Sequence, residues 1–320
     1  MDLCIKMSKP KLLLIADVYN WAIHTICLSL TPYLKIDFEV IIRSASDLTN
    51  EDVAQADVVY YSFWYMHNWF PQVIDIIRPY VNKTVVGVHS HYWFEDKVLT
   101  MPETDVLPQQ EHIDWLCSFP ILLAISSRLQ KLCSSFHSKS FVARNGVDTD
   151  IFSALPLRIT NPNPLVVGWA GNPDNHPGKR GLGLIREAVH RCGNKVVFKP
   201  AIGNYMQDNM RSMPDYYSSI DLYICASRCE GASTPIREAM ACGRPVISTR
   251  VGDSTDIIQD GVSGWLRDRS ISAFENKIAQ LSSNREIIVS AGQQASTQIR
   301  KKWSWNVIAP EWSSVFKLLV

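Results

Sequence analysis

Residues 225–265 read CASRCEGASTPIREAMACGRPVISTRVGDSTDIIQDGVSGW, and this stretch is the most informative part of the chain for the fold. The apolar run 222–226 predicts a buried strand, and a loop of small side chains follows it at residues 230–234. Pro235 suits the first turn of a helix, and Gly243 suits the left-handed cap at its C-terminus. We therefore expect a strand, a loop and a helix in which the backbone N–H groups of residues 231–234 bind phosphate.

Two glutamates, Glu230 and Glu238, lie in this stretch with seven residues between them. Glu230 follows the strand, from where its carboxylate can reach a sugar. We expect Glu238 in the first turn of the helix, where it accepts hydrogen bonds from ribose hydroxyls. In the simpler alternative, Glu238 is a surface residue favoured by the helix dipole and Glu230 is a loop charge.

Outside this stretch, short apolar runs alternate with helical patterns along the chain. This alternation predicts parallel sheets covered by helices, and the proline-rich segment 153–164 predicts a linker between two α/β domains. Ligands of open parallel sheets bind beyond the C-terminal strand ends, so two such domains would share a site in the cleft between them. The expected strands are residues 11–16, 38–42, 57–62, 84–89, 121–126, 140–144, 165–170, 195–199, 222–226 and 245–249, and the expected helices are residues 21–34, 71–81, 127–136, 182–192 and 237–242.

The composition excludes several classes of protein. The chain has 320 residues, 46% of them hydrophobic and 20% charged, which argues against disorder and allows two domains with their own cores. Eight cysteines without a CxxC pair favour reduced thiols in the cytoplasm. There is no signal-like N-terminus and no run of about 18 apolar residues, so we expect a soluble or peripheral protein. Nucleic-acid binding is not expected, because no continuous basic reader motif is present.

The net charge of +1 hides an uneven distribution. Residues 1–150 hold 12 Lys and Arg against 17 Asp and Glu, whereas residues 151–320 hold 20 against 14. A basic second half would favour a phosphorylated ligand held there, although scattered surface charge explains the same counts.

Several ordered motifs resemble those of the retaining glycosyltransferases of family 4. Glu230, Glu238 and AMACGRPVIST at residues 239–249 match the glutamate–seven residues–glutamate motif and the helix, turn and strand after it. A Gly-Gly-x-x-Glu-like turn of this family appears here as Gly252-Asp253-Ser254-Thr255-Asp256. Further matches are residues 260–266 (DGVSGWL), residues 144–148 (RNGVD) with Phe152, residues 180–185 (RGLGLI), and Trp303-Ser304-Trp305 at the start of the last helix.

The resemblance implies the GT-B fold, in which two Rossmann-like domains face each other across a cleft. It implies an N-terminal acceptor domain at residues 1–155, a donor domain at 156–302, and a helix at 303–320 that crosses back to the N-terminal domain. The implied reaction moves a sugar, with retention and without a metal ion or cofactor, from a nucleotide diphosphate sugar, most simply a UDP- or GDP-sugar. The acceptor would be a glycan, a glycolipid or another lipid-linked molecule, or a small molecule, and contact with the inner face of a membrane stays open.

The resemblance also assigns roles to individual residues. Glu230 and His89 are expected to be catalytic, and Glu238 to bind the ribose of the nucleotide. The donor diphosphate, whose charge grows as the bond breaks, is expected to be held by Lys179, Arg180, Ser233 and Thr234.

The chain departs from the family in two places. Where relatives have a Gly-Gly turn after the first strand, this chain has residues 17–22 (DVYNWA), and Asn172 stands near the place of a phosphate-binding arginine. We expect Asp17, Trp21, Asn172 and Gly231 to line the cleft. The aromatic segment 62–70 (SFWYMHNWF) would either contact an acceptor or pack in the core.

Two other functions remain in competition. The departures would suit a catalytically inactive glycosyltransferase-like protein that binds nucleotide sugars or acts as a scaffold, whereas the retained glutamates argue against it. A nucleotide-sugar epimerase of the same fold lacks specific support. His89 and His91 form an HxH pair, yet no acidic or cysteine ligand stands at a convincing spacing for a metal site.

Overall fold

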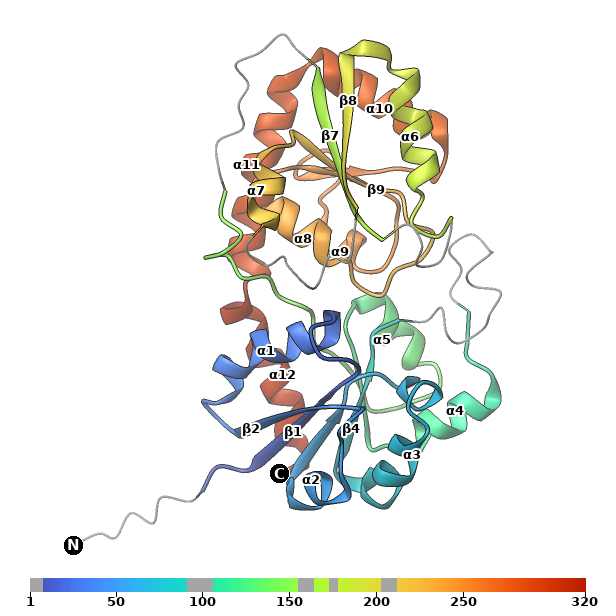
Figure 1. The fold of residues 1–320 in the computed structure, drawn as a ribbon, viewed down its shortest axis with the longest axis vertical. Coiled ribbons are helices and arrows are strands. Elements are labelled where there is room, and N and C mark those ends of the chain that lie inside the picture. The colour runs from blue at the N-terminus through green and yellow to red at the C-terminus, as the bar shows by residue number, and fades with distance from the viewer. Residues whose placement is uncertain (1–7, 91–105, 155–163, 173–177, 203–211) are drawn as a thin grey trace, which may run out of the picture.

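The computed structural model describes residues 8–90, 106–154, 164–172, 178–202 and 212–320. They form two α/β domains, each built on one parallel sheet (Figure 1). The expected linker at 153–164 lies largely outside the described residues, and His91 lies wholly outside them.

The N-terminal domain contains a six-stranded parallel sheet in the order β2-β1-β3-β4-β5-β6. Its central strands are buried because almost every side chain on them is apolar, as in LLLIA of β1 and VVYY of β3. The strands are β1 Lys11–Ala16, β2 Glu39–Ser44, β3 Val58–Tyr61, β4 Thr84–Val88, β5 Ile121–Ala124 and β6 Ser140–Val142, and the helices are α1 Ala22–Leu34, α2 Asn50–Gln55, α3 Gln72–Ile77, α4 Gln110–Cys117 and α5 Ser127–Cys133.

The C-terminal domain contains a five-stranded parallel sheet in the order β11-β10-β9-β7-β8. Its strands are β7 Leu165–Gly171, β8 Val196–Ile202, β9 Leu222–Cys225, β10 Val246–Ser248 and β11 Gly264–Leu266, and its helices are α6 Leu182–Arg191, α7 Met213–Ser218, α8 Thr234–Ala241, α9 Ser254–Ile257, α10 Ile271–Ser283 and α11 Arg285–Lys302. The expected strands are confirmed within a few residues. The helix expected at 237–242 begins earlier, at Thr234, and Gly243 has the predicted left-handed conformation with φ 74°.

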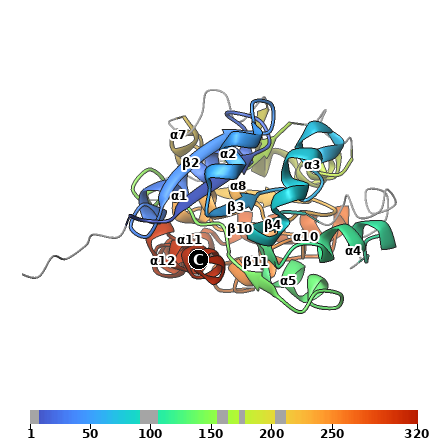
Figure 2. The ribbon, with the colours of Figure 1, turned by 90° about the horizontal axis from the view of Figure 1, so that it is seen from below.

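The last helix, α12 Trp305–Phe316, packs against α1 of the N-terminal domain (Figure 2). Its Trp312 donates from Nε1 to the carbonyl of Arg144 at 2.8 Å, and Ser313 donates to the carboxylate of Asp37 at 2.6 Å. At the start of the helix, a Cβ on Gly146 would lie 2.6 Å from the Trp305 ring, so only glycine allows this approach. The chain therefore returns to its first domain after completing the second.

Among the described residues, no helix has the length and apolar character needed to cross a membrane.

Candidate active site

The two domains meet where strands of both sheets end. His89 directly follows β4, and Gly231 lies in the loop after β9. A Cβ on Gly231 would lie 1.6 Å from the carbonyl oxygen of His89, which means that the two backbones touch. From the other side, a Cβ on Gly252 would lie 2.8 Å from the carbonyl oxygen of Gly231. The turn that carries Glu230 is thus held between the backbones of both domains.

Glu230 is buried, with 8% exposure, and its carboxylate contacts two side chains from different segments. Ser227 donates its hydroxyl to Oε1 at 2.8 Å, and Nη1 of Arg180 lies 3.3 Å from the same oxygen. The structure therefore brings together two residues that the sequence placed in one site. It also excludes the solvated loop charge as a description of Glu230.

Ser227 was missed by the sequence analysis, although a hydroxyl three residues before the candidate glutamate was visible. Its own position is fixed because its carbonyl accepts the hydroxyl of Thr249 at 2.7 Å. Ser227 therefore orients the carboxylate of Glu230 from the end of β9.

The basic segment at residues 179–181 packs against the same strand end. Gly181 has a φ of 70°, and a Cβ there would lie 2.2 Å from the carbonyl oxygen of Ala226. Lys179 is buried, with 4% exposure, and its carbonyl accepts the N–H of Arg228 at 2.8 Å. Arg269, another residue that the sequence analysis missed, donates to the carbonyls of Ala226 at 3.0 Å and Gly178 at 2.7 Å. These contacts hold Lys179 and Arg180 beside the loop of Glu230.

Glu238 is the fifth residue of α8, so the prediction that it lies in the first turn was wrong. The reason is that Thr234 and Pro235 already form the first turn, three residues before the apolar pattern indicated. The side chain is buried, with 6% exposure, and accepts a hydrogen bond from the Tyr217 hydroxyl at 2.9 Å. The surface alternative for Glu238 is therefore excluded.

The N-terminus of α8 contains a buried ion pair that the sequence did not indicate. Arg237 contacts the carboxylate of Asp253, and both side chains are at most 1% exposed. Asp253 also accepts the backbone N–H of Ser233 at 3.0 Å, and Arg237 donates to the hydroxyl of Thr234 at 3.3 Å. Burial raises the pKa of Asp253 in spite of the lowering effect of Arg237. The groups of Ser233 and Thr234 expected to bind phosphate thus have protein partners here.

His89 is half-buried at the end of β4, and its Nε2 lies 2.8 Å from the hydroxyl of Tyr60. Removal from water lowers the pKa of His89 to about 3, because a charged imidazolium loses its hydration there. The ring of Tyr60 in turn contacts Trp312 and Phe316 of α12, both at 5.5 Å between centroids. The last helix therefore supports the partner of His89.

We expect the His89 ring to stay neutral from pH 8 down to pH 5. The unfolded chain would take up a proton near pH 6.5, so stability contributed by neutral His89 is present above that pH and is lost as the pH falls toward 3. The measurement is the pH dependence of the His89 ring signals in NMR, assigned by their disappearance in His89→Gln. A titration midpoint between pH 6 and 7 would contradict the expected neutral ring.

The residues expected to line the cleft have different environments. Asp17 is only 7% exposed, burial raises its pKa, and its Oδ1 has no hydrogen-bond partner among the described residues. Trp21 is 51% exposed, and Asn172 is half-buried directly after β7. Within the aromatic segment, Trp64 is fully buried in the core, whereas Trp69 is 45% exposed. Core packing therefore explains part of this segment, and contact of Trp69 with an acceptor stays a prediction.

Among the described residues, no group of three or more His, Cys, Asp or Glu side chains is arranged to hold a metal ion.

Comparison with known families identifies the C-terminal domain. Residues 159–284 match the family described as Glycosyl transferases group 1. This domain is a member of that family. An uncharacterized glycosyltransferase of Methanocaldococcus jannaschii is 36% identical over 83 residues, which cover 26% of this chain and 23% of the relative. N-acetyl-alpha-D-glucosaminyl L-malate synthase of Bacillus anthracis is 27% identical over 111 residues, which cover 34% and 28%.

The group 1 domain and the N-terminal domain together have the GT-B fold of solved glycosyltransferases. Sucrose-phosphate synthase from Thermosynechococcus elongatus superposes with a TM-score of 0.74 at 13% identity, over 97% of this chain and 99% of that chain. HepE of Anabaena, solved with UDP and glucose, gives a TM-score of 0.72 at 15% identity, over 96% and 99%. At such identities the likeness shows the fold. The sequence matches to the two curated relatives span about a quarter of the length of those proteins.

Proposed function

We propose that this protein is a retaining glycosyltransferase that moves a sugar from a nucleotide diphosphate sugar to an acceptor held by the N-terminal domain. The observation that carries the proposal is the buried carboxylate of Glu230, which Ser227 and Arg180 hold. The loop of this glutamate touches the backbone of His89 in the other domain. Ligand sites often lie between domains and contain a few convergent polar groups, as this place does.

The proposed donor is a UDP- or GDP-sugar. HepE, which shares the fold, was solved with UDP and glucose and with UDP-glucose, which supports a uridine nucleotide as the first candidate. In our proposal the carboxylate of Glu238 binds the ribose hydroxyls. The hydroxyl of Tyr217, which donates to its Oε2, fixes the orientation of this carboxylate. Lys179 and Arg180 bind the diphosphate from the adjoining loop. Ser233 contributes its hydroxyl and Thr234 its backbone N–H, because the N–H of Ser233 and the hydroxyl of Thr234 already have protein partners.

The chemistry requires charge stabilisation as the bond between sugar and diphosphate breaks. Arg180 supplies a positive charge beside Glu230, and the negative Glu230 stabilises the positive character that develops at the anomeric carbon. We assign Glu230 no covalent bond to the sugar; the contacts of its Oε1 with Ser227 and Arg180 suit an electrostatic role. In this mechanism the departing phosphate takes the proton of the acceptor on the same face of the sugar, which retains the configuration. These side chains perform their roles without a divalent ion.

Thermal unfolding with UDP, GDP and ADP, and with their sugars, tests the donor site. One nucleotide series should raise the Tm by several degrees, because a ligand at 100 times its Kd stabilises the folded state by about 2.7 kcal/mol. Glu238→Ala should remove most of this shift. Glu187→Ala, at an exposed pair with Arg191 on α6, is the matched control and should preserve it.

Turnover of the donor that binds separates the two glutamates. Glu230→Ala should keep the Tm shift and lose at least about 100-fold in kcat, since it acts mainly on the transition state. Activity should persist in EDTA. Unchanged turnover in both glutamate variants would refute the assigned site, and no stabilisation by any nucleotide would refute the proposed donor.

A further inference from the structure

Three exposed aromatic side chains belong to loops that leave neighbouring strand ends of the N-terminal sheet. Tyr19 is 41% exposed, Trp21 is 51% exposed and Trp69 is 45% exposed, and the only other exposed aromatic side chain among the described residues is Phe141 on β6. Tyr19 and Trp21 belong to the loop between β1 and α1, and Trp69 to the segment between β3 and α3. Because β1 and β3 are neighbours in the sheet, both loops leave from adjacent strand ends.

The first of these loops is fixed by several contacts, although its aromatic side chains are exposed. Asn20 has a φ of 62°, and it is the one residue other than glycine with a positive φ in the described part of the chain. Its N–H donates to Nδ1 of His24 at 3.1 Å, and the N–H of Trp21 donates to the carbonyl of Val18 at 3.3 Å. Backbone strain that the surrounding structure maintains is common where a loop positions a ligand.

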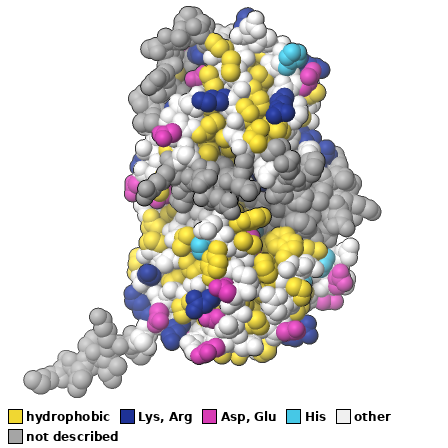
Figure 3. All heavy atoms as spheres, in the orientation of Figure 1, with side chains coloured by type: hydrophobic (Ala, Val, Ile, Leu, Met, Phe, Trp, Pro, Cys, Tyr) yellow, Lys and Arg dark blue, Asp and Glu magenta, His cyan; other side chains and the backbone are white. Residues whose placement is uncertain are grey.

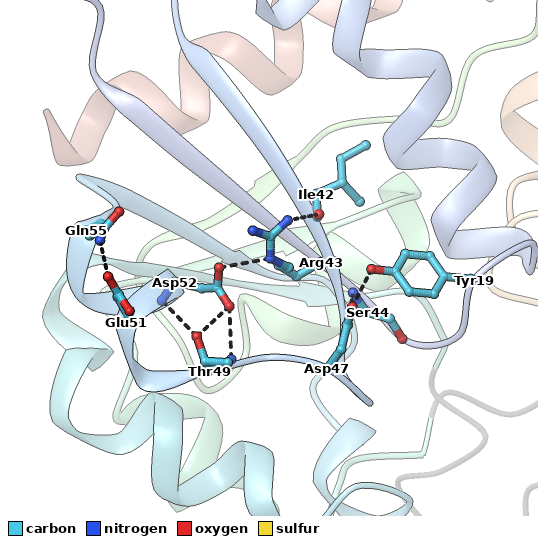
Figure 4. Close-up of polar contacts among 9 residues, drawn as sticks. All are labelled: Tyr19, Ile42, Arg43, Ser44, Asp47, Thr49, Glu51, Asp52 and Gln55. Atoms are coloured by element: carbon cyan, nitrogen blue, oxygen red, sulfur yellow. Dashed lines mark hydrogen bonds and ion pairs between the residues drawn. The ribbon is translucent and has the colours of Figure 1, made fainter.

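Tyr19 is anchored from the neighbouring strand (Figure 4). Its hydroxyl donates to Oδ2 of Asp47 at 2.7 Å, while Oδ1 of Asp47 accepts the N–H of Ser44 at the end of β2. The ring of His24 meets the ring of Tyr19 edge-on at 5.0 Å. Because this tyrosine is held at its hydroxyl and at its ring, a ligand that binds to it causes little loss of side-chain conformational entropy.

The second loop is connected to the same edge. Gln72, at the start of α3, donates from its side chain to the carbonyl of Ala45 at 3.4 Å, which places the segment of Trp69 beside the end of β2. The ring of Phe63 lies 5.4 Å from the ring of Trp69 and is itself buried. Trp69 therefore packs against a buried ring and is still 45% exposed.

The charges around these rings favour a neutral, hydroxyl-bearing ligand. Residues 17–24, 44–47 and 62–72 contain no Lys or Arg, and the adjoining Arg43 is paired with the carboxylate of Asp52 at 2.8 Å, so these loops attract anionic lipid only weakly. Exposed polar side chains that can bind hydroxyls, Asn20, Asp47 and Asn68, belong to the same loops. Aromatic faces combined with neutral or acidic hydrogen-bonding groups suit the apolar faces and hydroxyls of sugar rings.

We propose that Tyr19, Trp21 and Trp69 form a preorganised platform on which the sugar rings of a neutral glycan acceptor stack. The inference rests on the proposed function, for which it names the class of acceptor. The platform adjoins the candidate active site, because β4 with His89 is the next strand after β3. Figure 3 shows apolar side chains gathered on this domain beside its junction with the C-terminal domain.

The test is binding of the full chain to an array of neutral α- and β-linked oligosaccharides. The wild type should bind a defined set of glycans, and Trp21→Ala and Trp69→Ala should each lower the affinity for that set at least tenfold. Trp21→Phe should retain most of the binding, because a phenyl ring still stacks. Phe141→Ala, which removes an exposed aromatic ring from the far edge of the same sheet, should bind as the wild type does.

Two parallel measurements separate the failure of this inference from the failure of the proposed function. The Tm shift by the donor nucleotide depends on the C-terminal domain, so it should be unchanged in every platform variant. A wild type that is stabilised by nucleotide but binds no glycan, or tryptophan variants that bind glycans normally, would overturn the platform alone. The protein could instead bind no glycan and sediment with phosphatidylcholine–phosphatidylglycerol vesicles only when both tryptophans are present. That result would overturn the glycan platform and identify a lipid surface as the ligand.

Discussion

Replacing Gly231 with alanine is expected to lower turnover about 100-fold while nucleotide binding is retained. A Cβ at this position would lie 1.6 Å from the carbonyl oxygen of His89 and 3.2 Å from Cα of Ser90, so the nearest obstacles all belong to the N-terminal domain. Backbone atoms cannot rotate away as a side chain can. The added methyl group therefore has to separate the two domains, and a displacement of about 1 Å at reacting groups is enough for a 100-fold loss.

The matched control is Gly183→Ala. Gly183 lies in α6, and a Cβ there would meet nothing within 4 Å, so this substitution should leave turnover unchanged and raise helix stability slightly. Small-angle scattering should show a larger radius of gyration for Gly231→Ala than for Gly183→Ala. Wild-type turnover in Gly231→Ala, or loss of its nucleotide-induced Tm shift, would show that this glycine does not act through domain contact.

The contact of Gly231 illustrates which features the sequence could predict. Periodicity located every parallel strand except β11 within a few residues, because buried strands such as β1 are continuous apolar runs, whereas β11 has only three residues. The resemblance to family 4 assigned Glu230 and Arg180 to one site, and the two side chains lie 3.3 Å apart. Whether a glycine faces solvent or the backbone of another domain depends on how the domains pack, and local sequence contains no information on that.

The same limit explains the other residues that were missed. Tyr217 reaches Glu238 from α7, which the apolar pattern did not separate from its surroundings. Asp253 was noted only as part of a turn, and Arg237 only as a helix residue, although they form a pair that is almost completely buried. Charged residues are rarely buried, so composition alone favours a surface position for each of them. Only tertiary contact shows that they neutralise one another.

Arg237→Met is expected to lower the free energy of unfolding of the C-terminal domain by about 3–5 kcal/mol. Methionine fills much of the space of the arginine but leaves the carboxylate of Asp253 buried without its counter-charge. Asp253 would then be protonated on folding, because burial already raises its pKa with Arg237 present. The measurement is urea denaturation followed by circular dichroism, and Arg191→Met, at the exposed pair with Glu187, should cost less than about 1 kcal/mol.

The double variant Arg237→Met, Asp253→Asn distinguishes a charge pair from simple packing. Asparagine keeps an oxygen to accept the N–H of Ser233, so the turn before α8 retains its hydrogen bond while both charges are absent. The double variant should therefore be more stable than Arg237→Met alone, with a coupling energy of about 1–3 kcal/mol. Additive losses would mean that Arg237 stabilises α8 by contacts other than Asp253. Because α8 carries Glu238 and begins beside Glu230, a Tm shift by nucleotide that recovers in the double variant would link this buried pair to the donor site.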